Sequence, residues 1–234
     1  MKVGIMQPYF FPYLGYWQLI NAVDVYIVYD DVNYIKGGWI SRNNILLAGE
    51  KHLITIPLEG ASSFKKINEI RVTENVKARQ KVLKTIEMAY RKAPYFEAGM
   101  QMFEKLIMES DTIAMLNYNA ITLINKYLGI PTQIYLSSQI EKNAALSGQD
   151  KVIDINKRFG ADTYYNAIGG RKLYDGDTFK HNGIQLCFLE MGAVEYMQFN
   201  REFVPNLSII DVIMFNSVDD IKRMLQQYTL HWGG

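Results

Sequence analysis

The order of apolar and polar positions predicts alternating strands and helices from the first residues of the chain. Residues 2–5 and the run VYIVY at 25–29 indicate two buried strands, and the residues between them, from about Leu14 to Asn21, have a helical pattern. A strand, a helix and a second strand in this order predict two parallel strands joined by a right-handed crossover. Further strands are expected at 51–58, 131–138, 162–167 and 183–190.

Helical periods dominate the middle of the chain, from Glu74 to about Leu128. Pro94 divides this stretch because proline disfavours a helical conformation in the residue before it, and Gly129 is placed to end it. Further helices are expected at 147–160, 208–215 and 217–228, and polar loops at 30–44 and at the start of 60–73. The fold class that follows is α/β, a Rossmann-like, mainly parallel sheet with flanking helices and a helical insertion near 74–129. This insertion would form a lobe of one domain that spans residues 1–234.

Composition and charge narrow the classes of function. The 25 basic and 24 acidic residues leave a net charge of +1, which argues against broad binding of nucleic acid, because such binding usually needs a basic surplus. No apolar run approaches the ~20 residues that span a bilayer, and prolines interrupt the apolar part of the first residues, unlike a signal peptide. The single cysteine, Cys187, excludes a disulfide within the chain. We therefore expect a cytoplasmic protein.

Ligands of open α/β proteins bind beyond the carboxyl ends of the strands, and this rule selects four loops. They are 6–13, 30–44, 137–148 and 166–175. In the first loop two prolines fix the backbone, and Gln7, Tyr9 and Tyr13 are candidate substrate-binding residues. The alternative for the neighbouring rings of Phe10 and Phe11 is a hydrophobic plug at the end of the sheet.

The second loop, DDVNYIKGGWISRNN at 30–44, has the greatest polar diversity. Asp30 and Asp31 are candidate catalytic residues, because paired carboxylates can act as a general base, bind sugar hydroxyls or hold a divalent cation. Lys36 completes the candidate catalytic set as a point charge for phosphate. The candidate substrate-binding residues of this loop are Asn33, Trp39, Arg42 and Asn43. The alternative is a solvated hairpin in which the acidic and basic side chains pair with each other.

The fourth loop begins NAIGGRKLYDGD at residue 166 and adds the candidate substrate-binding residues Asn166, Gly169, Gly170 and Arg171. Its glycines allow close approach of the backbone, and the arginine suits an anion, although a bare turn has the same composition. The loop matches neither the dinucleotide-binding nor the P-loop pattern. The three histidines lie outside the four loops, so no Cys-His pair, Ser-His-Asp triad or zinc spacing is formed, and no metal site is predicted.

Several of these stretches together resemble the WbqC-like proteins. They are MQPYFFPYLGYWQLI at 6–20, YDDVNYIKGGWISRNNI at 29–45, MAYRKAPYF at 88–96, GADTYYNAIGGRKLYD at 160–175, FKHNGIQL at 179–186 and VPNLSIIDVIMFNS at 204–217. They extend over almost the whole chain. The positions that match the family pattern are Gln7, Pro8, Pro12, Gly15, Asp30, Lys36, Trp39, Arg42, Asn43, Tyr95, Gly169, Gly170 and Asp211.

The resemblance implies an enzyme of bacterial O-antigen or other surface polysaccharide biosynthesis. We expect a transferase that moves an acyl or aminoacyl group onto a nucleotide-linked sugar. No cofactor is assigned, and a divalent cation and an acyl-thioester donor are the two candidates. Its candidate partners are this small-molecule substrate, a second copy of the chain and other enzymes of polysaccharide biosynthesis. Two alternatives stay open. One is a degenerate nucleotidylyltransferase or ligase, suggested by PYLGY at 12–16, and the other is a non-catalytic partner of a glycosyltransferase.

Overall fold

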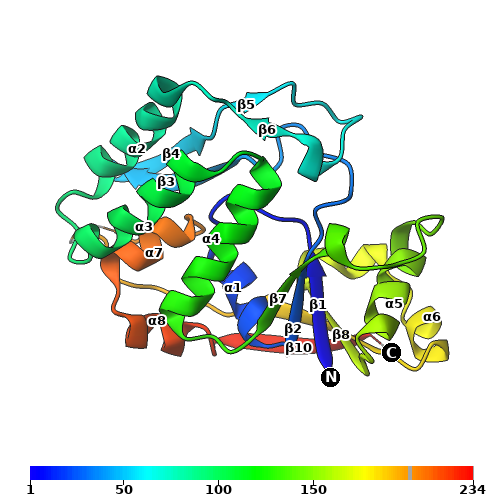
Figure 1. The fold of residues 1–234 in the computed structure, drawn as a ribbon. Coiled ribbons are helices and arrows are strands. Elements are labelled where there is room, and N and C mark those ends of the chain that lie inside the picture. The colour runs from blue at the N-terminus through cyan, green and yellow to red at the C-terminus, as the bar shows by residue number, and fades with distance from the viewer. Residues whose placement is uncertain (200–201, 234) are drawn as a thin grey trace.

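Six strands form the central sheet of the computed structural model, which describes residues 1–199 and 202–233 (Figure 1). In spatial order they are β10 (Tyr228–Gly233), β9 (Gln185–Met191), β8 (Thr163–Ala167), β1 (Lys2–Met6), β2 (Val25–Val28) and β7 (Gln133–Leu136). All neighbouring strands are parallel except β10, which runs antiparallel to β9. The predicted α/β fold with a mainly parallel sheet is therefore confirmed.

Both faces of the sheet are buried, as expected for parallel strands. Val3 pairs with Val25 on one side and Tyr164 on the other, and this row packs against α5 (Gly148–Arg158) and α6 (Gly176–His181). The next row contains Tyr26 and Tyr165, which belong to the larger core on the opposite face together with α1 (Leu14–Asn21). Successive residues of each strand thus enter two different cores.

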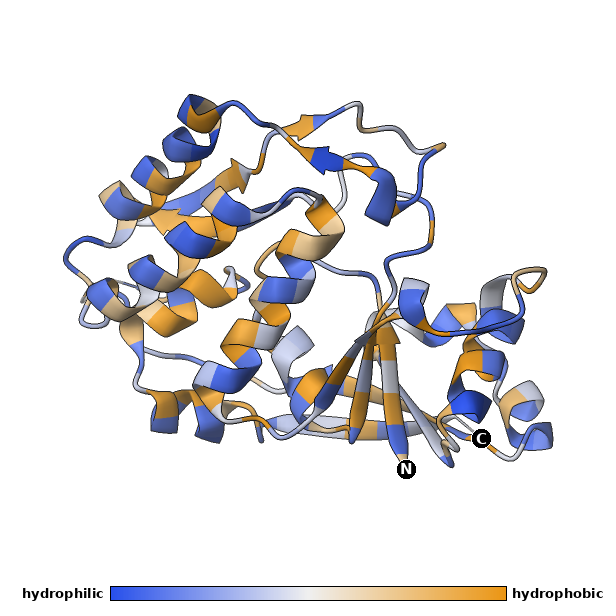
Figure 2. Cartoon of the chain, in the orientation of Figure 1, coloured by the Kyte–Doolittle hydropathy of each residue, from blue (hydrophilic) through white to orange (hydrophobic). Residues whose placement is uncertain are grey.

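The predicted helical insertion is present as α2 (Val76–Tyr90), α3 (Phe96–Glu109) and α4 (Ile113–Leu128). Figure 2 shows hydrophobic and hydrophilic residues interleaved along these helices, as amphipathic helices require. The side chains of Asn75 and Thr112 cap α2 and α4, and Gly129 ends α4 in a left-handed conformation with φ of 64°. Packed with them are α7 (Ile209–Phe215), α8 (Val218–Met224) and two small ladders, β3 (Arg42–Leu47) with β4 (Glu50–Thr55) and β5 (Leu58–Glu59) with β6 (Arg71–Val72).

Two parts of the secondary-structure prediction are wrong. The expected loop at 30–44 ends early, because its last three residues begin β3 and pair with β4 from Arg42 opposite Thr55. The two asparagines that follow Arg42 disfavour a strand locally, and the long-range pairing overrides that preference. The helix expected at 217–228 ends at Met224, and the residues from Tyr228 add the edge strand β10 instead.

The order of the strands creates a crevice at the carboxyl ends of β1 and β8. From β1 the chain continues through α1 to β2, whereas from β8 it continues through the short helix η3 (Ile168–Leu173) and α6 to β9. Because α1 and α6 pack on opposite faces of the sheet, the two connections diverge. Open α/β sheets bind their ligands at such a switch in strand order.

Candidate functional site

Two adjoining cavities occupy the position that the strand order predicts. The larger, of about 400 Å³, lies between the loop after β1, the start of α1 and the residues of η3. The second, of about 340 Å³, extends past Asn43 to Asn206. Because both cavities are lined by Tyr9, Tyr13 and Trp39, we treat them as one site and call it the switch-point cleft. Residues from the three loops 6–13, 30–44 and 166–175 therefore meet here.

The loop after β1 is held by side chains that bind its backbone carbonyls. Tyr16 donates to the carbonyl of Gln7, Asn117 to that of Pro8, and Trp17 to that of Pro12. Asn43 donates to the carbonyls of both Phe10 and Phe11, and Ser208 also donates to that of Phe11. Phe11 has a φ of 42°, a left-handed conformation that is uncommon for a residue with a Cβ. These contacts maintain that conformation, so the wall of the cleft is formed before a ligand arrives.

The aromatic residues of this loop divide into two groups. Phe10 and Phe11 are fully buried with their ring centroids 4.8 Å apart, so they are core residues, as the alternative interpretation held. Tyr9 and Tyr13 line the cleft. Burial raises the pKa of both tyrosines above the ordinary value, and the pKa of Tyr9 is raised further by Tyr13. Both phenols therefore keep their protons at neutral pH and can donate hydrogen bonds.

Trp39 comes to this wall from the next loop. The backbone N–H of Phe10 donates to the carbonyl of Trp39 at 2.8 Å, which joins the two loops. A Cβ at Gly15 would lie 2.9 Å from the ring of Tyr13, so the present position of this ring depends on glycine at that site. Tyr9, Tyr13 and Trp39 thus border both cavities, and Tyr16 also lines the larger one, an arrangement suited to stacking on a sugar or a base.

The opposite wall consists of the end of β8 and η3. Asn166 is buried, and its Nδ2 donates to the hydroxyl of Tyr164 at 2.5 Å and to that of Tyr174 at 3.3 Å. A Cβ on Gly170 would lie 2.6 Å from Oδ1 of Asn166, so the close approach of this backbone requires glycine. No heavy atom comes within 4 Å of the same position on Gly169, which leaves open space beside the cleft.

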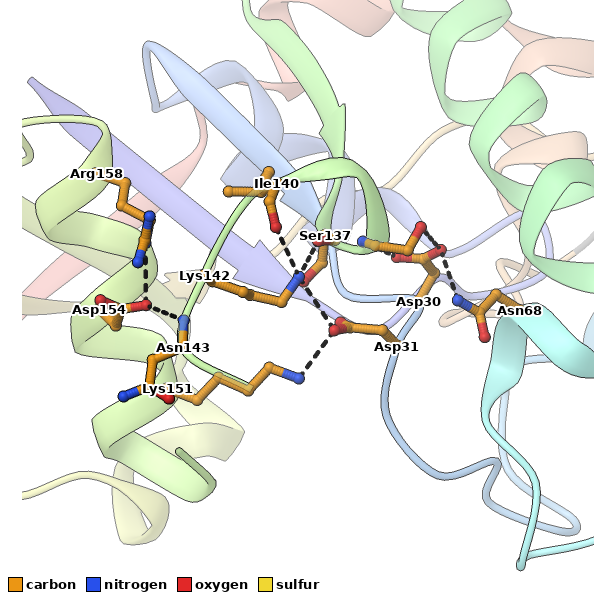
Figure 3. A network of polar contacts seen from close by, with 11 residues as sticks. Asp30, Asp31, Asn68, Ser137, Ile140, Lys142, Asn143, Lys151, Asp154 and Arg158 are labelled. Carbon is orange, nitrogen blue, oxygen red and sulfur yellow. Dashed lines mark hydrogen bonds and ion pairs between the residues drawn. The ribbon is translucent and has the colours of Figure 1, made fainter. Parts of the chain in front are cut away.

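The two candidate catalytic aspartates lie elsewhere, where β2 meets the loop after β7 (Figure 3). Asp30 is buried and accepts hydrogen bonds from the backbone and the hydroxyl of Ser138 at 2.9 and 2.6 Å. Asp31 lies 3.1 Å from Nζ of Lys142 and 2.9 Å from that of Lys151. Burial alone would raise the pKa of Asp31, but the hydroxyl of Ser137 and the two ammonium groups together hold it below the ordinary value. These contacts join β2 to the loop after β7 and to α5.

The other predicted site residues are also placed by the fold. Asn43, Asn166, Gly169 and Gly170 line the cleft together with the three rings. The remaining predicted site residues are not among the described residues that line the cleft. They are the two aspartates, Gln7, Asn33, Lys36, Arg42 and Arg171. Lys36 and Arg171 are exposed, and Arg42 donates to the carbonyl of Gly37. Their predicted roles, and those of the aspartates, stay predictions.

The sequence did not indicate Asn206, which lies before α7 with a φ of 59°. The segment that carries it is held by Asp211, a fully buried carboxylate that accepts from Tyr90, Tyr196 and Gln198 at 2.7, 2.6 and 2.7 Å. Burial raises the pKa of Asp211, and the three donors lower it part of the way back. Asparagine adopts the left-handed conformation more readily than most residues. The asparagine of PNLS was therefore the available sequence signal for a turn at Asn206.

Charge is scarce in the lining of the cleft. No charged side chain is among the described residues that line it. Within residues 1–199 and 202–233, no group of three or more histidine, cysteine or acidic side chains is placed to hold a metal ion. The helices of the same described ranges include none with the length and apolar character needed to cross a membrane.

Comparison with known proteins gives the family of the chain. No solved structure matches it significantly. It is 28% identical over 221 residues to the uncharacterized protein Rv1507c of Mycobacterium tuberculosis, an alignment that covers 92% of this chain and 93% of that protein. The sequence profile of the WbqC-like protein family matches residues 7–223. The chain therefore belongs to the WbqC-like protein family.

Proposed function

We propose that the switch-point cleft binds a nucleotide-linked sugar, and that the protein transfers an acyl or aminoacyl group to it in the synthesis of a bacterial surface polysaccharide. One observation carries this proposal. A preformed hollow with three aromatic side chains on one wall and a glycine-containing backbone on the other lies at the switch in strand order. Aromatic faces suit sugar rings and bases, and amides and phenols suit hydroxyl groups.

The parts of the ligand can be assigned to parts of the cleft. Tyr9, Tyr13 and Trp39 would stack on the sugar or the base, and Asn166 would lie beside hydroxyl groups. The first backbone N–H groups of α1, whose terminus is not capped by the side chain of Tyr13, would meet phosphate oxygens next to Gly15. Arg171 follows Gly170 on the exposed side of η3 and would supply a positive charge at the rim.

A second candidate function is binding without catalysis, as a partner of a glycosyltransferase. It is favoured by the absence of charged side chains among the described residues that line the cleft. General acid–base catalysis usually uses a carboxylate, an imidazole or an amine within hydrogen-bond reach of the reacting group. An enzyme built on this cleft would instead depend on positioning, on phenol donors and on groups at the rim.

Ligand titration tests the binding part of the proposal. Calorimetry with uridine-, guanosine-, thymidine- and cytidine-linked sugars should identify one class that binds. Trp39→Ala should weaken this binding about 5- to 150-fold, because a stacked base contributes about 1–3 kcal/mol. Trp232→Ala is the matched control, since Trp232 is 55% exposed and outside the cleft whereas Trp39 is 46% exposed within it. Absence of binding by every nucleotide sugar at millimolar concentration, or equal losses in both variants, would refute it.

Mass spectrometry of the bound sugar separates the two candidates. Incubation with an amino-sugar nucleotide and an acyl-thioester should add the mass of the acyl group if the protein is a transferase. Unchanged sugar despite tight binding would favour the non-catalytic function. Binding of free nucleotide with magnesium, without any contribution from the sugar, would instead support the nucleotidylyltransferase or ligase alternative.

A further inference from the structure

One exposed aromatic side chain stands apart from the rest of the surface. Phe64, in the loop between β5 and the short helix η1 (Ile67–Glu69), is 95% exposed. This loop projects from the body of the molecule (Figure 1). Its turn is ordered, because the N–H of Lys65 donates to the carbonyl of Ser62 at 3.1 Å and that of Phe64 to the Ser62 hydroxyl at 3.3 Å. The ring is therefore held out in water by a defined backbone.

A second exposed turn lies directly beside the first. The N–H of Tyr34 donates to the carbonyl of Lys65 and that of Ile67 to Val32, both at 2.9 Å, so the two segments pair antiparallel. The pairing leads into a turn in which the N–H of Gly38 donates to the carbonyl of Ile35 at 3.1 Å. Ile35 is 52% exposed. Two neighbouring turns thus present apolar side chains to solvent.

The charged residues of this region have a single sign. Residues 32–49 and 60–68 contain four basic residues, Lys36, Arg42, Lys65 and Lys66, and no aspartate or glutamate. The three lysines are exposed. Two acidic residues border the range 60–68 in the chain. Glu69 accepts a hydrogen bond at 2.7 Å from the backbone N–H of Lys66, and Glu59 accepts one at 2.9 Å from that of Glu74. We call the surface formed by Ile35, Lys36, Phe64, Lys65 and Lys66 the basic rim.

We propose that the basic rim docks the protein on an anionic phospholipid surface. Phe64 and Ile35 would enter the boundary between headgroups and acyl chains, and the three lysines would lie against lipid phosphates. An apolar tip flanked by lysines fits this occupant because its two parts match the two layers that a bilayer presents, apolar beneath and anionic above. The net charge of +1 gives the chain as a whole no strong attraction to an anionic surface, so the proposed contact depends on the side chains of the rim.

Docking in this manner has a consequence for the switch-point cleft. Trp39 lines the cleft and follows Gly38, the last residue of the Ile35 turn. The mouth of the cleft would therefore open close to the lipid surface. The membrane contact needs no particular ligand in the cleft, so it stands or falls independently of the proposed activity.

Sedimentation of the full chain with lipid vesicles tests the proposal. The wild type should sediment with mixed phosphatidylcholine and phosphatidylglycerol vesicles but not with phosphatidylcholine alone, and added salt should release it. Replacing Lys36, Lys65 and Lys66 together by alanine should lower the partition coefficient roughly 100-fold, at about fivefold per lysine. Phe64→Ser should lower it at least several-fold without changing the thermal unfolding temperature, because the ring contacts little of the folded protein.

Matched controls exist on α2. Lys77, Lys81 and Lys84 are also exposed, and their joint replacement by alanine changes the net charge equally. Met88→Ser removes an apolar side chain that is 62% exposed there. Both controls should keep vesicle binding. Equal losses of vesicle binding in rim and control variants would overturn the proposal. So would a wild type that does not sediment with anionic vesicles. If such a wild type captured an acidic protein instead, the rim would be assigned to a protein partner.

Discussion

Replacement of Asp211 offers the sharpest test of how the fold supports the cleft. Its carboxylate is fully buried and accepts hydrogen bonds from Tyr90, Tyr196 and Gln198. Tyr196 and Gln198 belong to the segment that leads to Asn206 in the cleft wall. Loss of the carboxylate should therefore lower both the stability of the protein and the order of that wall.

The size of the effect follows from which donors are left without an acceptor. In Asp211→Ala, the buried hydroxyl of Tyr90 loses its acceptor, at about 1–3 kcal/mol for a buried donor. Tyr196 is half-buried and can turn to water, and Gln198 keeps the carbonyl of Val204 at 3.3 Å, so each adds less. We expect a loss of about 3 kcal/mol in the free energy of unfolding, and about half of that for Asp211→Asn, which retains one oxygen.

The pH dependence has a definite sign. Because burial raises the pKa of Asp211 in the folded protein, the folded state binds this proton more tightly than the unfolded state does. The stability that this group contributes is fully present below the ordinary pKa of an aspartate and is lost as the pH rises through the raised value. The advantage of the wild type over Asp211→Asn should therefore shrink as the pH rises from about 4, the ordinary pKa of an aspartate, through the raised value.

Urea unfolding followed by tryptophan fluorescence, at several pH values, measures both quantities. Tyr90→Phe is a useful companion, because it removes one donor and leaves the carboxylate. In a double-mutant cycle the two changes should be coupled. A loss below about 1 kcal/mol for Asp211→Ala, or a gap to Asp211→Asn that widens as the pH rises, would refute this account of the buried carboxylate.

Two further predictions concern other parts of the structure. Asp31→Asn should lower the free energy of unfolding by about 2 kcal/mol near neutral pH, because it leaves two largely buried lysines unpaired. One of these lysines, Lys142, keeps carbonyl acceptors. Since the pKa of Asp31 is lowered, the wild type should lose this contribution as the pH falls through the lowered value. A difference in urea midpoint between wild type and Asp31→Asn that does not change with pH would contradict the pairing. Gly170→Ala should destabilise the protein by about 1–3 kcal/mol and weaken ligand binding, because its Cβ would meet Asn166. Gly169→Ala, with open space at the same position, should leave the free energy of unfolding within about 0.5 kcal/mol of the wild type. Equal calorimetric melting temperatures for Gly169→Ala and Gly170→Ala would contradict the close approach of Gly170 to Asn166.

The composition of the candidate site was accessible from the sequence, but its geometry was not. Tyr9, Tyr13 and Trp39 were selected because they follow strands, and they do meet in one cleft. Asp30 and Asp31 were selected by the same rule and lie at another strand end. Nothing in the local pattern separates these two outcomes, because Trp39 follows the same strand as the two aspartates. The difference comes from contacts with distant segments, namely Phe10 for Trp39 and Ser138 for Asp30.

Local sequence also left open which rings of the first loop are exposed. Phe10 and Phe11 are buried and Tyr9 and Tyr13 line the cleft, although all four lie within one run of aromatic residues. The φ of 42° at Phe11 turns the backbone, and the contacts that maintain it come from residues far along the chain. A period of two or of 3.6 residues does not describe such a loop.

The α/β class, the helical insertion at 74–129 and the first crossover are predictable from the sequence alone, because they follow from periodic burial and from proline and glycine at element ends. Three features become visible only in the folded chain: β1 lies between β2 and β8, β10 forms one edge of the sheet, and Arg42 begins a strand. The physical reason is that strand pairing is made by backbone groups that every residue carries. The pattern of side chains therefore indicates which face of a strand is buried. Which strand lies beside it depends on how the whole chain packs.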